Sequence, residues 1–203
     1  MIVLIEKGGI IMALILILAF VATVIIVERL LYFRKIRIDE NAMIERLNSA
    51  LQKKHYDEAI NICENNPSPI SNLMKVGIEH RDYSSGDIKD KIMSAANMEI
   101  PSMERYLTSL GTIAHISPLL GLLGTVTGNI KAFGVLGEFG TVGDPALLAT
   151  GISEALLTTA AGIIVSVPAI SFYNFLVNKV NHIIMRLENR VNDMVLLLGK
   201  ENE

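Results

Sequence analysis

The sequence contains very little of several residue types that enzymes and secreted domains use. Among its 203 residues there is no tryptophan, one cysteine and only 5% aromatic residues. The single cysteine, Cys63, cannot form a disulfide within the chain, and no metal or redox motif accompanies it, so we expect no cofactor and no metal. The formal net charge is −3, and no basic stripe with interleaved aromatics is present. We therefore do not expect nucleic-acid binding.

Motifs of the common catalytic classes are also missing. The sequence has no Gly-x-Ser-x-Gly, no His-Glu-x-x-His and no Walker-type phosphate loop. No nucleophile, base and oxyanion donors can be assembled into a catalytic set. We therefore expect that the protein is not an enzyme, and that any energy it uses comes from a transmembrane gradient.

Apolar residues, in contrast, are abundant. Hydrophobic residues make up 51% of the chain, charged residues 19%, and the mean hydropathy is +0.44. Three apolar runs reach the roughly 20 residues that a transmembrane helix needs: Gly8–Val27, about 107–132 and about 145–178. The first run continues without the small-residue cleavage site of a signal peptide, so we expect a retained anchor. The fold class predicted is an all-α membrane protein with three transmembrane helices.

Charges beside the first run predict its orientation. Basic residues concentrate at positions 28–37, directly after the run. Because basic residues mark the cytoplasmic side of a span, the N-terminus should lie outside and the C-terminus in the cytoplasm. With this topology only Lys7 and Lys131 lie at the outer face.

Domain boundaries follow from these spans. We expect an outer N-terminus and first transmembrane helix (1–27), a cytoplasmic helical region (28–106), the second and third transmembrane helices (107–178), and a cytoplasmic C-terminal helix (179–203). The outer loop between the last two spans (133–145) is rich in glycine, and Pro145 suits the first turn of the third helix.

The region 39–105 has helical periodicity, with predicted breaks near 53–55 and at 66–69 and a loop at 83–87. Pro101 is expected to kink the last helix before the second span. After the third span, apolar residues recur with alternating steps of three and four, which predicts one continuous helix extending into the cytoplasm. This apolar seam consists of Val180, Ile184, Leu187, Val191, Met194 and Leu198. The seam could pack on the other cytoplasmic helices or mediate self-association, and the sequence does not distinguish the two.

One charge interrupts the third span. Glu154 is the only charged residue between Pro145 and Asn178. A carboxylate at membrane depth costs about 2.5–3.5 kcal/mol on insertion scales, so such residues usually serve ion or proton passage. The alternative is a structural acid, hydrogen-bonded at a subunit seam.

Hydroxyl groups accompany this carboxylate. Thr150 and Thr158 lie four residues on either side of Glu154, Thr159 adjoins them, and Thr125 lies at a similar depth in the second span. A carboxylate with hydroxyls along one cavity can relay protons, although a threonine also satisfies itself by bonding to its own helix. Glu154, Thr125 and Thr159 are the predicted proton pathway, with Thr158, Thr150 and His115 as accessory candidates.

Small residues recur on one face of both later spans. Residues of this kind let transmembrane helices approach closely. We expect helix packing from Gly121, Gly124, Gly128, Gly151 and Gly162.

Two long motifs lie in the second and third spans. They are residues 110–128 (LGTIAHISPLLGLLGTVTG), and residues 151–162 (GISEALLTTAAG) followed by 167–169 (VPA) and 173–174 (YN). In this order they resemble the second and third spans of the MotA/TolQ/ExbB proton-channel family. The likeness is closer to the TolQ and ExbB branches than to the flagellar stator branch.

The resemblance implies a homopentameric ring in the bacterial inner membrane, with spans two and three forming the pore. Two copies of an ExbD- or TolR-like single-span protein would occupy the pore, a TonB- or TolA-like protein would transmit force, and the positions matching Thr125, Thr159 and Glu154 would line the channel. Proton motive force would then drive energised outer-membrane transport, as for ExbB, or envelope maintenance, as for TolQ. Asn129 departs from the apolar residue common in the family, and Lys131 follows it near the outer end of the span.

Two other functions fit the same sequence. A passive membrane scaffold would use Glu154 only to lock subunits together. A sodium-driven stator-like subunit would have a similar build.

Overall fold

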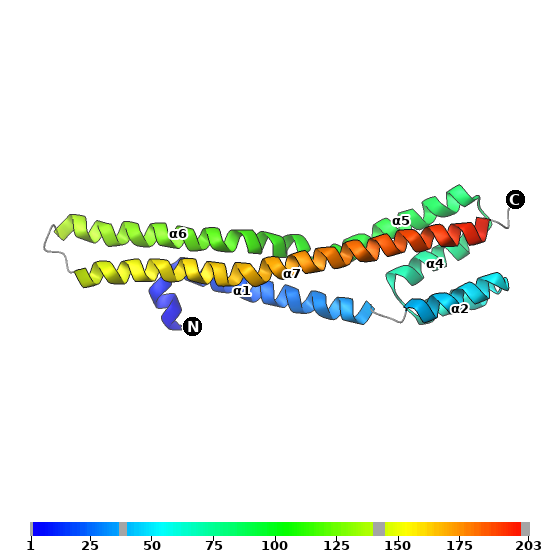
Figure 1. Cartoon of the computed structure of the whole chain (residues 1–203), viewed down its shortest axis with the longest axis horizontal. Helices are drawn as coiled ribbons and strands as arrows, with labels where there is room; N and C mark the ends of the chain where they lie inside the picture. The colour runs from blue at the N-terminus through cyan, green and yellow to red at the C-terminus, as the bar shows by residue number, and fades with distance from the viewer. Residues whose placement is uncertain (1, 37–39, 140–144, 200–203) are drawn as a thin grey trace. The chain divides into compact units, whose positions relative to one another are not determined.

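The computed structural model describes residues 2–36, 40–139 and 145–199, and the regular elements in these ranges are all helices. They are shown in Figure 1: α1 (Ile2–Ile36), α2 (Glu40–Gln52), α3 (Tyr56–Asn65), α4 (Pro69–Glu79), α5 (Ser85–Glu104), α6 (Leu107–Phe139) and α7 (Pro145–Gly199). The chain divides into two compact units. Unit 1 comprises Met1–Arg29 and Tyr106–Leu176, and unit 2 comprises Leu30–Arg105 and Val177–Glu203.

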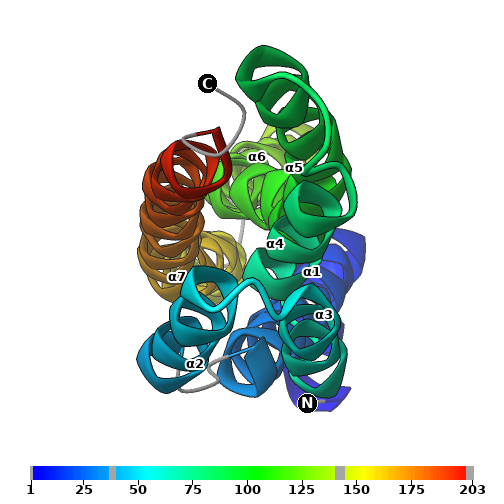
Figure 2. The ribbon, with the colours of Figure 1, turned by 90° about the vertical axis from the view of Figure 1, so that its right-hand side faces the viewer.

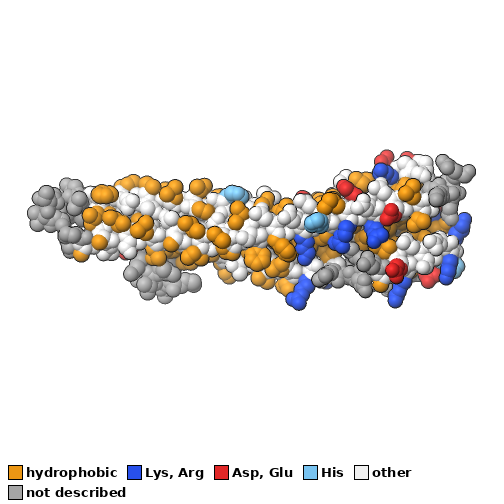
Figure 3. All heavy atoms as spheres, in the orientation of Figure 1, with side chains coloured by type: hydrophobic (Ala, Val, Ile, Leu, Met, Phe, Trp, Pro, Cys, Tyr) orange, Lys and Arg blue, Asp and Glu red, His pale blue; other side chains and the backbone are white. Residues whose placement is uncertain are grey.

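Three helical stretches in the described ranges are long and apolar enough to cross a membrane. They are Gly9–Ile36, Ser85–Gly134 and Leu148–Leu198. In the space-filling view, hydrophobic side chains are spread over the helices of unit 1, whereas Lys, Arg, Asp and Glu are gathered over unit 2 (Figure 3). The prediction of an all-α, multi-pass membrane protein is therefore confirmed.

Helix α1 is bent at Gly9. This residue has φ 59° and ψ −154°, a conformation that essentially only glycine adopts. Beyond the bend, Met12 and Ile15 are buried within unit 1, whereas Ile10 and Phe20 are 81% and 71% exposed. Side chains of this size on the outside must be covered by lipid or by other chains.

An arginine is almost completely buried at the end of the α1 segment that belongs to unit 1. Arg29 is 2% exposed, and its Nε donates to the Glu28 carboxylate at 2.5 Å. Its guanidinium also lies over the ring of Tyr106, 5.7 Å from the ring centroid. Tyr106 has φ 64°, in the left-handed region, at the point where α6 is about to begin. Arg29 belongs to the basic residues at positions 28–37 that predict the orientation, and its burial was not expected from the sequence.

Unit 2 is a helical bundle with well-defined helix ends (Figure 2). Helix α2 ends in a Schellman motif, because Lys54 N–H donates to Leu51 at 2.9 Å, His55 N–H donates to Ala50 at 3.0 Å, and Lys54 has φ 60°. Ser68 and Ser84 cap α4 and α5 by accepting backbone N–H groups. These ends agree with the expected breaks at 53–55, 66–69 and 83–87.

The C-terminal part of α7 packs inside unit 2 through the predicted heptad seam. Val180, Leu187, Val191, Met194 and Leu198 are all buried. Ile184, which the heptad also included, is only half-buried. Its neighbour Ile183 is buried as well, because a helix of 3.6 residues per turn drifts relative to a strict heptad.

The expected outer loop is too long at its N-terminal end. Residues 133–145 were expected to connect two helices, but α6 continues to Phe139. Gly134 and Gly137 are therefore helical, since isolated glycines lower helix stability without ending a helix. Residues 140–144 of that loop lie outside the described residues, and α7 begins at Pro145 as expected.

Candidate functional site

Helices α6 and α7 lie side by side in unit 1 and approach closely where glycines face the partner helix (Figure 1). A Cβ atom added at Gly162 would lie 2.5 Å from the carbonyl oxygen of Ser117, and one at Gly128 would lie 2.6 Å from Cβ of Ala155. One added at Gly151 would lie 3.0 Å from Cβ of Ala132. Gly121 and Gly124 meet α7 in the same way, at residues 158 and 159. Any larger residue would push the helices apart.

The carbonyl oxygen of Gly121 faces three threonine hydroxyls in this interface. Thr159 donates to it at 3.0 Å, and Thr158 and Thr125 each approach at 3.3 Å. Thr125 also reaches the carbonyl of Ala155 at 3.3 Å, and the hydroxyls of Thr125 and Thr159 are hydrogen-bonded to each other. Because a hydroxyl has one proton, these contacts are alternatives between which protons can switch. The hydroxyl cluster thus links α6 and α7 with exchangeable hydrogen bonds.

A proline opens a second polar link between the two helices. Pro118 has no N–H, so the carbonyl of Ala114 loses the partner it would have one turn later in α6. Ser166 of α7 replaces that partner by donating to Ala114 at 2.6 Å, in a buried position. Ser166 was not among the predicted site residues. The sequence feature that could have predicted this hydrogen bond is the proline four residues after Ala114, together with a hydroxyl on the facing helix.

Glu154 lies half-buried on α7, at the level of this cluster. Thr125 contacts the carbonyl of Ala155, the residue that follows Glu154, so the carboxylate and the hydroxyl pair lie at similar depth. In the described part of the chain, however, no hydrogen bond or ion pair engages the Glu154 carboxylate.

Helices α6 and α7 form an antiparallel hairpin, and the Glu154 carboxylate and the Thr125–Thr159 hydroxyl pair lie on different sides of it. Glu154 and Thr159 are five residues apart, which places them about 140° apart around the helix axis. A single chain therefore brings Thr125 and Thr159 together but does not bring Glu154 to them. The buried Thr158, predicted as an accessory, joins the cluster through Gly121 and also donates to Ala155 at 2.7 Å.

The other two accessory candidates are satisfied by their own helices. Thr150 is exposed and donates to the carbonyl of Ala146 at 2.8 Å. His115 is exposed, and its Nδ1 lies 2.6 Å from the carbonyl of Gly111. A carbonyl can only accept, so Nδ1 carries the proton in this hydrogen bond.

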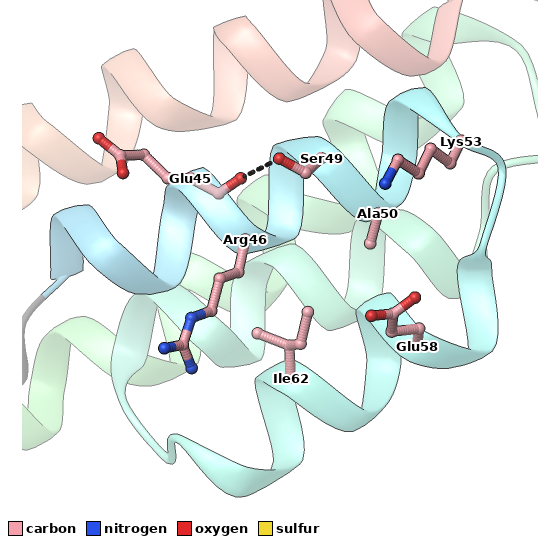
Figure 4. Close-up of a pocket in the computed structure, with 7 residues that line it drawn as sticks. All are labelled: Glu45, Arg46, Ser49, Ala50, Lys53, Glu58 and Ile62. Carbon is pink, nitrogen blue, oxygen red and sulfur yellow. Dashed lines mark hydrogen bonds between the residues drawn. The ribbon is translucent and has the colours of Figure 1, made fainter.

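Unit 2 has an open cleft of about 500 Å³ between α2 and α3, shown in Figure 4. Its lining mixes acids and bases, with Glu45, Arg46, Lys53 and Glu58 around Ile62. The Ser49 hydroxyl donates a hydrogen bond to the backbone carbonyl of Glu45 at 2.9 Å. Lacking a paired base and nucleophile, this cleft does not form a catalytic set. Among the described residues, no group of three or more His, Cys, Asp or Glu could hold a metal ion.

Comparison with known proteins identifies the family of this chain. Residues 65–189 match the model of the MotA/TolQ/ExbB proton channel family. An ExbB homolog from Methanothermobacter thermautotrophicus is 28% identical over 90% of this chain and 65% of its own length. An ExbB-like biopolymer transport protein from Synechocystis is 31% identical over 97% of this chain and 75% of its own length. The Tol-Pal system protein TolQ of Haemophilus influenzae is 36% identical over 53% of this chain and 46% of its own length.

The chain thus spans just under two thirds of the archaeal relative and less than half of TolQ. The family match includes α6 and the part of α7 that carries Glu154 and the hydroxyl cluster. This chain is a member of the MotA/TolQ/ExbB proton channel family.

Proposed function

We propose that this protein is the proton-channel subunit of a membrane complex that converts proton motive force into mechanical work. One observation carries the proposal: an otherwise uncharged transmembrane segment holds Glu154 at the level of a hydrogen-bonded threonine pair that joins two tightly packed helices. Ionisable residues at membrane depth are costly and usually mark ion or proton pathways. Hydroxyls that exchange hydrogen-bond partners supply the relay.

The pathway would be completed between copies of the chain. Glu154 and the Thr125–Thr159 pair leave one hairpin on different sides, so a ring of hairpins would place the carboxylate of one copy beside the hydroxyls of another. Apolar side chains on the outside of α6 and α7 support such an assembly; Ile130 is 65% exposed and Ile164 is 71% exposed. A homopentamer, as the family resemblance implies, is the arrangement we propose.

The partners we propose also come from the family. Two copies of an ExbD- or TolR-like single-span protein would occupy the ring, and a TonB- or TolA-like protein would carry the force. The names of the relatives, biopolymer transport protein and Tol-Pal system protein, suggest energised transport or envelope maintenance as the work performed. The orientation we propose has unit 2 and the basic residues at 28–37 in the cytoplasm, within a bacterial inner membrane.

The experiment is ion flux through proteoliposomes that contain this protein and an ExbD- or TolR-like partner. We expect proton uptake that is unchanged when potassium replaces sodium. The double variant Thr125→Ala/Thr159→Ala should lose this uptake while the ring still assembles, as judged by native mass spectrometry. Thr150→Ala is the matched control, because that hydroxyl bonds only its own helix in the structure.

Other outcomes favour the alternatives. Uptake that requires sodium would support the stator-like reading. A ring that assembles but carries no ions would support the passive scaffold.

A further inference from the structure

Helix α6 carries one lysine or arginine, Lys131, and the apolar stretch of α7 from Pro145 to Asn178 carries one charge, Glu154. Lys131 is exposed and Glu154 is half-buried. Lys131 lies eight residues before the end of α6 at Phe139, and Glu154 lies nine residues after the start of α7 at Pro145. The two opposite charges are therefore at nearly the same distance from the outer end of the hairpin.

The packing of the two helices fixes the register between these residues. Gly128 faces Ala155, and Gly151 faces Ala132. In an antiparallel pair these contacts define a local two-fold axis, perpendicular to both helices, that relates position 128 to 151 and position 132 to 155.

Lys131 and Glu154 occupy equivalent positions about this axis. Lys131 follows Gly128 by three residues and precedes Ala132 by one, and Glu154 follows Gly151 by three and precedes Ala155 by one. A two-fold axis of this kind keeps equivalent residues on the same face of the hairpin. At 1.5 Å per residue, the two lie about 3 Å apart along the helix axes.

In the structure Lys131 and Glu154 form no ion pair, and the lateral gap between them is one that rotation of the two side chains would close. Helices packed through small residues have axes roughly 8 Å apart, and a lysine and a glutamate side chain together span that gap. Asn129 provides the contrast. It lies two residues from Lys131, about 160° around the helix, and so faces the opposite side of the hairpin, where Thr125 is.

We propose that Lys131 is the counter-charge of Glu154, a positioning residue whose ammonium group pairs with the carboxylate across the α6–α7 hairpin within one chain. Charged residues in transmembrane segments usually pair with one another, because each alone is costly in hydrocarbon. The pair keeps this level of the hairpin neutral whenever Glu154 is ionised. The pairing is inferred from the helix register alone. The role of the pair in ion transfer rests on the proposed function and adds a residue to it.

The first test is chemical cross-linking of the full-length protein in membranes. In a Cys63→Ala background, Lys131→Cys with Glu154→Cys is treated with a short bismaleimide, and isotope-labelled and unlabelled copies are mixed before assembly. We expect cross-linked peptides whose two halves carry the same label. The matched control pair, Asn129→Cys with Glu154→Cys, should cross-link poorly within the chain. Equal cross-linking of both pairs, or cross-links only between differently labelled copies, would overturn the proposal.

The second test is proton flux in the reconstituted complex. Lys131→Met should reduce flux by at least about tenfold, since the ionised carboxylate loses its partner, whereas Lys131→Arg should remain within about threefold of wild type. Lys131→Met/Asn129→Lys moves the ammonium group to the other face and should not restore flux. Wild-type flux in Lys131→Met would overturn the role of the pair. Absent flux in the wild-type complex would count against the proposed function instead, and the cross-links would still decide the pairing.

Discussion

The hydroxyl of Ser166 donates a hydrogen bond to the carbonyl of Ala114 at 2.6 Å, from α7 to α6. It fills the place of the backbone N–H that Pro118 cannot supply. A proline in a transmembrane helix leaves a carbonyl that must be satisfied by a neighbour, because hydrocarbon offers no water. The carbonyl that Pro118 leaves unpaired in α6 is thereby used for a hydrogen bond between the two helices.

This link predicts a specific double-mutant cycle. Ser166→Ala leaves the Ala114 carbonyl unsatisfied and should destabilise the protein by about 1–2 kcal/mol. In a Pro118→Ala background the helix supplies its own N–H, so the same change should cost much less. The measurement is thermal unfolding of the four proteins in detergent. Ser171→Ala serves as a control, since that exposed hydroxyl bonds only to Val167 of its own helix. Equal costs of Ser166→Ala in both backgrounds would contradict the interpretation.

The close approach of α6 and α7 predicts which glycines tolerate alanine. The added Cβ of Gly162→Ala would lie 2.5 Å from the Ser117 carbonyl oxygen and 3.2 Å from Cα of Gly121, both rigid backbone atoms. Overpacking of this kind costs about 1–3 kcal/mol, and we expect a lower melting temperature and weaker assembly.

Gly134→Ala is the matched comparison for Gly162→Ala. Gly134 is also helical, but nothing lies within 4 Å of an added Cβ there. Its replacement should be neutral or stabilise the helix by up to about 1 kcal/mol. If Gly162→Ala were as well tolerated as Gly134→Ala, the close packing described above would be incorrect.

Burial raises the pKa of the Cys63 thiol from 9.0 to about 11, and the nearby Lys75 ammonium offsets only part of this effect. A raised pKa keeps the thiol neutral at physiological pH, and the side chain is 3% exposed. We therefore expect negligible labelling by a maleimide at pH 7–8 in the folded protein, and complete labelling after denaturation. Labelling of the native protein should increase only as the pH approaches 11. Rapid native labelling at pH 7 would mean that the helices around Cys63 open readily.

Much of the fold could be predicted because its signals are local. Apolar runs, proline and serine at helix starts, and heptad spacing specify the helices, as at Ser68, Ser84 and Pro145. One local signal was misleading. Gly134 and Gly137 suggested a loop, yet helix α6 passes through them to Phe139, since isolated glycines weaken a helix without ending it.

The candidate site was less predictable because contacts between helices decide it. Residue type and depth identified Glu154, Thr125 and Thr159, but the direction of each side chain depends on how α6 and α7 pack. The spacing of Glu154 and Thr159 already separates them around the helix, but the contacts of Gly121 and Gly128 define which face of α7 meets α6. The acceptor role of the Gly121 carbonyl has no sequence signal, since every residue has a carbonyl.

Proton flux through the reconstituted complex with Glu154→Gln tests the central claim most directly. The amide has nearly the same shape as the carboxyl group and keeps its hydrogen-bonding capacity, but it cannot ionise. We predict that Glu154→Gln assembles normally and loses proton flux, whereas Glu154→Asp retains a measurable fraction of it. Undiminished flux in an assembled Glu154→Gln complex would show that protons do not pass by this carboxylate.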